Sequence, residues 1–295
     1  MNQRVLITGA NGLVGSALKE RLIDAVCTDV SSSPSVDVRN LPLLENLIIK
    51  NNITTIYHLA GLLSVGGEKN PDLAWDVNIN GLKNILDLAV KYHLQIFWPS
   101  SIAAFGPTTP QVNTPQHTIL EPTTIYGATK VAGELLCQYY FLKKGVDVRS
   151  LRYPGLIAWQ APPGDGTTEY SVHIFYAAAK TNSYDCFLNS NTILPMMYID
   201  DAIDGTLKLM DAPADKISIR TSYNFSALSF SPQDLVSEIV KIRPGFVCTY
   251  HPDHRQQIAD TWPKTIDDSV ARADWGWQPK TDLSKLVSVM TEHIK

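Results

Sequence analysis

The chain has 295 residues, enough for one large domain or for a core domain with a smaller partner. Hydrophobic residues make up 44% and charged residues 18%, as expected for a protein that buries a core. The net charge of −4 and the lack of a Lys/Arg run argue against binding to a nucleic-acid backbone, and every apolar run is too short to span a membrane.

In chain order, the first half alternates between strand-like and helix-like segments. Short β-branched apolar runs predict strands at 4–9, 25–30, 53–61, 95–101 and 147–157. Amphipathic spacing predicts helices at 13–23, 41–52, 70–93 and 124–145. This alternation predicts an α/β fold of the Rossmann type, a doubly wound parallel sheet with helices on both faces.

After residue 158 the pattern becomes less regular. We expect a loop at 159–170, helices at 171–182 and 231–244, and a closing helix within 275–295. The chain is therefore predicted to have a dinucleotide-binding domain at 1–158 and a smaller α/β substrate lobe at 159–295. Strands near 195–200 and 223–226 are candidates to return to the main sheet.

The segment "TGANGLVG" places Gly9, Gly12 and Gly15 between the first strand and the first helix. Glycine permits tight turning and close approach of the backbone to a pyrophosphate, and the helix start supplies free N–H groups. We therefore expect this loop to bind a dinucleotide.

Asp29 ends the second strand, twenty residues after Gly9. A carboxylate there suits the ribose hydroxyls of NAD and repels the 2′-phosphate of NADP. No Arg or Lys occurs in "DVSSSPSVD", which favours NAD. Asp37 either contacts the adenine amine or has a role in a turn.

Tyr126 and Lys130, in "YGATK", are four residues apart and share one face of the predicted helix. Ser100 and Ser101 end the fourth strand, at the edge where open α/β sheets bind ligands. An ammonium beside a phenol favours the phenolate, which can accept a proton from a substrate hydroxyl. Ser101 would orient that hydroxyl, with Ser100 as the second candidate.

The motifs "TGANGLVG", "HLAG", "NINGLKNIL", "PSSIAAFG", "YGATK", "RYPGLI" and "MMYIDDAIDG" follow one another along nearly the whole chain. In this order the chain resembles the extended short-chain dehydrogenase/reductase family, also called the NAD-dependent epimerase/dehydratase family. The resemblance implies the fold given above, an NAD cofactor, and Tyr126, Lys130 and Ser101 as catalytic residues. The cofactor contacts that it implies are Gly9, Asn11, Gly12, Leu13, Val14, Gly15, Asp29, Asp37, Val38, Leu59, Ala60, Gly61, Asn78, Ser100, Tyr126, Lys130, Tyr153, Pro154 and Ile157.

"SIAAFGPTTP", "PPGDGTTEYSVHIFYAA" and "LPMMYIDD" resemble one group of this family, the short-chain L-threonine 3-dehydrogenases. This resemblance implies oxidation of L-threonine at C3 to 2-amino-3-oxobutyrate, with NAD as the hydride acceptor. The implied substrate contacts are Ser64, Ser101, Tyr126, Thr167, Thr168 and Glu169. A carboxylate for the ammonium and hydroxyls for the carboxylate are the groups that a small zwitterion needs.

Three alternatives remain. A UDP-sugar epimerase or dehydratase would need basic residues in the C-terminal lobe, for which Arg220, Arg243 and Arg255 are candidates. A non-catalytic NAD sensor would not need Tyr126. A zinc enzyme is disfavoured because His251 and His254 have no third ligand nearby, so we expect no metal.

The family also implies a homodimer that packs helices near 72–92 and 126–144 into a four-helix bundle. The four cysteines are scattered without a C-x-x-C pair, and the first strand follows directly on the N-terminal Met. We therefore expect a cytoplasmic enzyme with no signal or transit segment, no nucleic-acid partner and no membrane partner.

Overall fold

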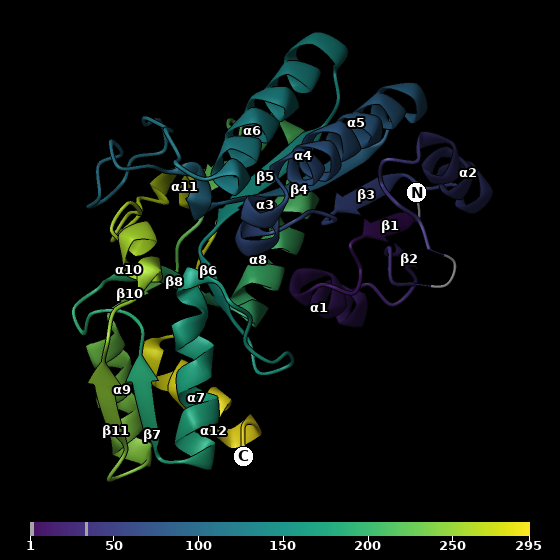
Figure 1. Cartoon of the computed structure of the whole chain (residues 1–295). Coiled ribbons are helices and arrows are strands. Elements are labelled where there is room, and N and C mark those ends of the chain that lie inside the picture. The colour runs from purple at the N-terminus through teal and green to yellow at the C-terminus, as the bar shows by residue number, and fades with distance from the viewer. Residues whose placement is uncertain (1–2, 33–34) are drawn as a thin grey trace. The chain divides into compact units, whose positions relative to one another are not determined.

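The computed structural model describes residues 3–32 and 35–295 (Figure 1). The strands are β1 (Val5–Thr8), β2 (Val26–Thr28), β3 (Thr55–His58), β4 (Gln95–Ser101), β5 (Val148–Tyr153), β6 (Gly155–Ile157), β7 (Ser183–Cys186), β8 (Leu194–Tyr198), β9 (Tyr223–Asn224), β10 (Leu228–Phe230) and β11 (Val247–Tyr250). The α-helices are α1 (Leu13–Arg21), α2 (Leu41–Asn51), α3 (Ser64–Lys69), α4 (Pro71–Trp75), α5 (Gly81–Tyr92), α6 (Ile125–Lys144), α7 (Tyr170–Lys180), α8 (Ile199–Asp211), α9 (Pro232–Ile242), α10 (His254–Ala259), α11 (Ser269–Trp275) and α12 (Leu283–His293). The 3₁₀ turns are η2 (Ile102–Ala104), η3 (Thr167–Glu169) and η4 (Ala214–Lys216), and η1 (Asp76–Asn80) is a π-helical turn.

The chain divides into two compact units that interleave along the sequence. The first contains Met1–Ala104, Pro122–Arg152 and Thr206–Tyr223, and the second contains Phe105–Glu121, Tyr153–Gly205 and Asn224–Lys295. The assignment of cofactor binding to 1–158 and of substrate binding to 159–295 stays a prediction.

The main sheet has six strands in the order β2-β1-β3-β4-β5-β9. The pairs β1–β2, β1–β3 and β3–β4 are parallel, and β3 and β4 follow β1 on the side away from β2. The predicted doubly wound α/β fold is therefore confirmed. From β1 the chain adds β2 on one side of the sheet and then β3 and β4 on the other. The position between β1 and β3 is therefore a topological switch point, the place where such sheets bind dinucleotides.

The strands of this sheet are buried because helices cover them. Every residue of β1 and β3 is buried, as expected for parallel strands that are covered on both faces. A single apolar cluster joins strand residues such as Leu6 and Ile56 to Leu44 of α2, Leu86 of α5 and Cys137 of α6. Helices α4, α5 and α6 lie side by side in the first unit (Figure 1).

Three segments differ from the sequence-based expectation. The helix predicted at 70–93 is formed by α4, η1 and α5, so a π-turn interrupts it. Helix α3 was not predicted, because two glycines weaken its helical pattern. The strand predicted at 147–157 is divided by Pro154, which lacks the N–H that a continuous ladder needs, so β5 and β6 join different sheets.

The second unit contains two small sheets. One has the order β10-β8-β6, with β8 antiparallel to β10 and parallel to β6, and β11 pairs with β7 in the other. The strand expected near 195–200 is therefore β8 and lies in this three-stranded sheet, not in the main one. The strand expected near 223–226 is β9, and it does join the main sheet beside β5.

Candidate active site

The backbone of the glycine loop lies so close to its neighbours that two of its positions have no room for a side chain. Gly9 has a φ of +68°, and a Cβ there would lie 2.5 Å from the backbone nitrogen of Ala60. A Cβ on Gly15 would collide with the carbonyl oxygen of Gly9. These two glycines therefore bring β1, the end of β3 and the start of α1 together.

The start of α1 is open to an anion. Its N-cap, Gly12, offers no side-chain hydrogen bond, and the first turn contains no acidic residue. The first N–H groups of a helix have no partner within the helix, and they carry the positive end of its dipole. The loop therefore provides the donors and the backbone space that a pyrophosphate requires.

Asp29 is held in its ionised form at the end of β2. Its carboxylate accepts from the N–H groups of Asn11 at 3.2 Å and Ser31 at 3.0 Å, and from the Ser31 hydroxyl at 2.8 Å. Burial opposes ionisation, but these hydrogen bonds outweigh it and keep the pKa of Asp29 below its ordinary value. An ionised acceptor is what the ribose hydroxyls of NAD need.

Lys19 is a neighbour of this site that sequence reasoning missed. Its Nζ donates to Oδ1 of Asn11 at 3.3 Å, and its charge favours the ionised form of Asp29. No spacing in the sequence indicates this proximity, and only the fold brings Lys19 of α1 near Asp29 after β2.

Asp37 and Val38 lie in the segment before α2. The Asp37 carboxylate is paired with Arg39 at 2.6 Å, and Arg39 also pairs with Asp76 at 3.0 Å. Val38 is buried, and it leaves no room for a Cβ on Gly81 at the start of α5. Contact of Asp37 with adenine stays a prediction. Its carboxylate already pairs with Arg39.

Leu59, Ala60 and Gly61 directly follow β3, and Asn78 supports them from the π-turn η1. The Asn78 amide accepts from the N–H of Leu62 at 2.8 Å and donates to the Leu62 carbonyl at 3.0 Å and to Thr129 Oγ1 at 3.1 Å. It therefore ties the segment after β3 to α6. This geometry favours support of the site over direct contact with a cofactor.

Tyr126 lies in the first turn of α6. The helix begins after Thr124, whose hydroxyl accepts from the N–H of Gly127 at 3.0 Å. A Cβ on Gly127 would collide with the carbonyl of Ala103, so this turn lies directly against the segment that follows β4. The approach brings Tyr126 close to Ser101, the last residue of β4, whose hydroxyl accepts from the N–H of Ala103 at 3.1 Å.

Lys130 lies one turn further along the same face of α6. Its Nζ is 5.3 Å from the centre of the Tyr126 ring and 4.7 Å from that of Trp98, and it donates to the carbonyl of Pro99 at 2.7 Å. The structure thus brings the three predicted catalytic residues together in the first unit.

The electrostatics of the pair are set mainly by burial. Burial lowers the pKa of Lys130 to about 8, against the opposing effects of Cys137 and Glu134. Burial raises the pKa of Tyr126 to about 12, against the opposing effect of Ser101. At neutral pH Lys130 is therefore mostly an ammonium and Tyr126 a phenol.

Ser100 points to a different partner. Its hydroxyl donates to Oε1 of Glu134 at 2.6 Å, and both side chains are buried. Arg152 pairs with the same carboxylate through two hydrogen bonds, of 2.9 and 2.7 Å. Because the Ser100 hydroxyl is bonded to this ion pair, the geometry favours Ser101 over Ser100 as the predicted catalytic serine.

The remaining predicted residues divide between the two units. Ser64 begins α3 in the first unit, whereas Tyr153 ends β5, Pro154 follows it and Ile157 ends β6 in the second.

Thr167, Thr168 and Glu169 form η3 in the second unit. Thr167 is buried, and Thr168 approaches Gly155 so closely that a Cβ there would lie 2.7 Å from the Thr168 methyl. The Glu169 carboxylate accepts from the N–H of Gly164 at 3.1 Å.

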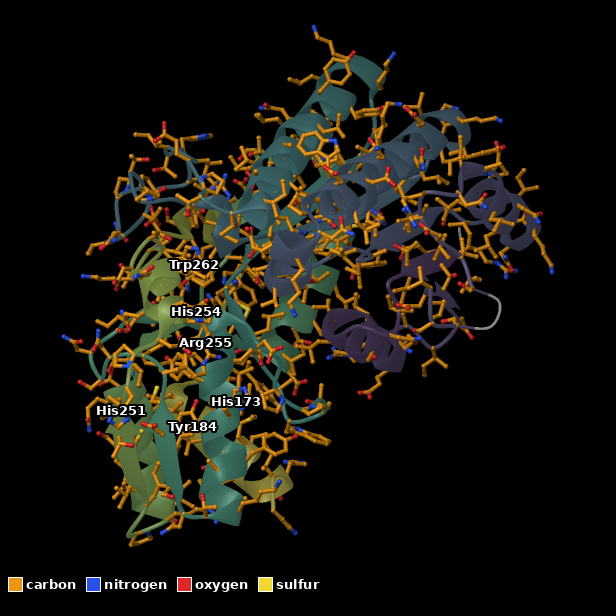
Figure 2. All side chains as sticks on the ribbon, in the orientation of Figure 1. His173, Tyr184, His251, His254, Arg255 and Trp262 are labelled. Atoms are coloured by element: carbon orange, nitrogen blue, oxygen red, sulfur yellow. The ribbon has the colours of Figure 1, made fainter. Side chains whose placement is uncertain are left out.

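His251 and His254 are the two histidines of the H-x-x-H segment, and Figure 2 labels both. Their side chains are 73% and 80% exposed, and each lies beside an aspartate, Asp185 and Asp253 respectively. Across residues 3–32 and 35–295, no group of three His, Cys, Asp or Glu side chains is placed to hold a metal ion. In the same residues, no helix has the length and apolarity needed to cross a membrane.

Comparison with known proteins identifies several relatives along most of the chain. L-threonine 3-dehydrogenase, mitochondrial, from Bos taurus is 45% identical over 305 residues, covering 98% of this chain and 82% of the relative. The holo structure of a GalE-like L-threonine dehydrogenase from Cupriavidus necator is 48% identical, with a TM-score of 0.96 and coverage of 99% and 100%. A monomeric L-threonine 3-dehydrogenase from a metagenome database, in its apo form, is 46% identical, with a TM-score of 0.93 and coverage of 98% of each chain.

A family model described as the NAD dependent epimerase/dehydratase family matches residues 5–224. The glycine loop, the open start of α1 and the ionised Asp29 fit the NAD that this family uses, so the predicted cofactor and the predicted NAD-dependent enzyme are confirmed. The chain belongs to the NAD dependent epimerase/dehydratase family.

Proposed function

We propose that this enzyme oxidises L-threonine at C3, with NAD as the hydride acceptor, and releases 2-amino-3-oxobutyrate. The observation that carries the proposal is the Tyr126–Lys130 pair on one face of α6, with Nζ of Lys130 5.3 Å from the centre of the Tyr126 ring and Ser101 close to Tyr126. The substrate is supported by relatives of 45% and 48% identity that are named as L-threonine dehydrogenases.

The first unit would hold the cofactor. Gly9, Gly12 and Gly15 would let the backbone approach the pyrophosphate, the start of α1 would bind it, and Asp29 would bind the adenosine ribose. When bound, NAD supplies the carbon that accepts the hydride.

Tyr126 would be the general base. It accepts the proton of the substrate hydroxyl while Ser101 hydrogen-bonds the same oxygen and holds it in place. A phenol with a pKa of about 12 is a weak base at neutral pH, so nearby positive charge must favour its ionised form. The Lys130 ammonium, 5.3 Å from the ring centre, is the charge that the chain itself provides.

Thr167, Thr168 and Glu169 of the second unit would bind the amino acid. The hydroxyls donate to the threonine carboxylate, and Glu169 accepts from its ammonium. Burial raises the pKa of Glu169, and the Gly164 N–H opposes this effect. The ammonium of the bound substrate would lower this pKa and favour the ionised carboxylate.

A UDP-sugar substrate has less support. Arg220 pairs with Asp147 at 2.6 Å, Arg243 donates to the carbonyl of Ala178 at 3.0 Å, and Arg255 pairs with Asp253 at 2.6 Å. The three arginines considered for a diphosphate thus each have a protein partner.

We also propose that the enzyme is a homodimer and is cytoplasmic. Leu135, Tyr139 and Leu142 follow one another on one face of α6 and are 58%, 49% and 64% exposed, which supports a homodimer through the α5–α6 region. One relative, however, is named as monomeric. All four cysteines are unpaired, which is compatible with a cytoplasmic enzyme of threonine catabolism.

The test is the rate of NADH formation by the purified protein with L-threonine. NADP⁺ in place of NAD⁺, and a panel of UDP-sugars in place of threonine, serve as controls. We expect threonine-dependent NADH and little reaction with NADP⁺, because Asp29 repels a 2′-phosphate. Conversion of a UDP-sugar without threonine oxidation would contradict the proposal.

A further inference from the structure

Gly164, in the second unit, is held through both of its backbone polar groups. Its N–H donates to Oε2 of Glu169 at 3.1 Å, and its carbonyl hydrogen-bonds Nε2 of His173 at 3.0 Å. A carbonyl oxygen only accepts, so Nε2 of His173 carries the hydrogen and donates. Two side chains thus fix a single glycine of the segment that leads into η3.

The helix explains why both side chains reach the same glycine. Glu169 is the residue before α7, and His173 lies four residues later, one helical turn away on the same face. Helical side chains lean toward the N-terminus of their helix, which directs His173 back toward the residues before α7.

His173 is itself held in place by an aromatic cluster. Its ring meets that of Phe187 edge-on, with centroids 6.3 Å apart. Phe187 also meets Tyr170 edge-on at 6.5 Å, and the guanidinium carbon of Arg255 lies 3.2 Å from the centre of its ring. Figure 2 labels His173 on α7 and Arg255 on α10. The donor is therefore packed against the aromatic side chain of Phe187.

The other end of the segment has its own anchor. The ring of Trp159 stacks on that of His293 in α12, with centroids 4.2 Å apart and an angle of 17° between the planes. Pro162 and Pro163 restrict the backbone between the two anchors. Residues 159–166 are thus fixed at Trp159 and again at Gly164.

We propose that His173 is a positioning residue for the threonine site, an inference that rests on the proposed function. By holding Gly164 against the first turn of α7, it keeps Thr167 and Thr168 in place and leaves Oε1 of Glu169 to face an ammonium. His173 does not touch the reacting atoms. Its loss therefore weakens threonine binding and leaves NAD binding and the chemical step unchanged.

Two variants separate the hydrogen bond from packing. His173→Leu keeps apolar bulk against Phe187 but removes the donor, whereas His173→Gln keeps an N–H donor at a similar reach. We expect His173→Leu to raise KM for L-threonine about 10-fold, the effect of losing one hydrogen bond, with KM for NAD and kcat nearly unchanged. His173→Gln should restore most of the loss. His251→Leu, which removes an exposed histidine elsewhere in the same unit, should behave as wild type.

Amide hydrogen exchange without substrate provides a readout that does not depend on activity. We expect the peptide covering residues 160–169 to exchange faster in His173→Leu than in wild type or His251→Leu. Unchanged exchange, an unchanged KM for threonine, or equal rises in KM for threonine and NAD would each overturn the role of His173. Those results leave threonine oxidation by the wild type intact, whereas a wild type that does not oxidise threonine overturns the proposed function as well.

Discussion

Ser100 and Ser101 are adjacent in the chain but have different partners. The Ser100 hydroxyl donates to the buried Glu134, whereas the Ser101 hydroxyl accepts from the N–H of Ala103 and lies close to Tyr126. One serine therefore supports the structure beneath the site, and the other is available for chemistry.

His58 makes stability depend on pH. Burial lowers its pKa to about 3, and the charge of Lys130 acts in the same direction. In the unfolded chain a histidine has a pKa of about 6.5. Because the folded pKa is the lower one, the unfolded state binds more protons below pH 6.5, and stability is lost as the pH falls from about 6.5 toward 3.

We expect the loss of stability between about pH 6.5 and pH 3 to be absent from His58→Gln. Between about pH 7.5 and pH 5.5, His58 should lower the free energy of unfolding of the wild type by about 1 kcal/mol. Urea unfolding of both proteins at the two pH values measures the difference. Equal pH dependence in the two proteins would show that His58 does not remain neutral in the folded state.

At the level of elements, α6 carries two of the proposed catalytic residues and the buried carboxylate of Glu134. Tyr126, Lys130 and Glu134 follow at intervals of four residues and share one face. Glu134 is 1% exposed and pairs with Arg152 from β5, which fixes α6 against the sheet. Asn78 fixes the same helix through Thr129.

Glu134→Gln should therefore destabilise the first unit strongly. Removing one partner of a buried ion pair leaves an uncompensated charge and typically costs about 3–5 kcal/mol. Glu238→Gln is the matched control, because its partner Lys241 is 67% exposed and such pairs contribute about 0–1 kcal/mol. Chemical denaturation measures both variants, and similar small losses would contradict a stabilising role for the Glu134–Arg152 pair.

Features formed by residues close together in the sequence could be predicted, whereas features that join distant residues could not. The glycine loop and the Tyr126–Lys130 pair were evident from sequence because their function depends on local spacing within one turn or one helix. The proximity of Lys19 to Asp29 depends on how α1 packs beside β2, which spacing does not encode. The choice between Ser100 and Ser101 required the position of Glu134.

Segment boundaries were less predictable for related reasons. Pro154 interrupts an otherwise continuous apolar run, and only the sheets show that β5 and β6 diverge there. The π-turn η1 keeps the periodicity of a helix nearly intact, so the pattern from 70 to 93 gives no sign of it. The position of β8 depends on long-range pairing with β6 and β10.

At the scale of the whole molecule, the exposed face of α6 predicts self-association. Leu135→Glu together with Leu142→Glu should convert a dimer into a monomer in light scattering, because charges would be buried at the interface. Val240→Glu, at a 38% exposed position on α9, should leave the mass unchanged. A wild-type protein that is already monomeric at micromolar concentration would contradict the dimer.

The central claim is that Tyr126 is the base in threonine oxidation, and Tyr126→Phe tests it most directly. The measurement is kcat for NADH formation from L-threonine and NAD⁺, with the Kd for NADH determined in parallel. We predict turnover by wild type, a loss of roughly 100- to 10,000-fold in kcat for the variant, and a Kd that changes little. A variant that keeps the wild-type kcat, or a wild type that binds NADH but does not oxidise threonine, would contradict the account.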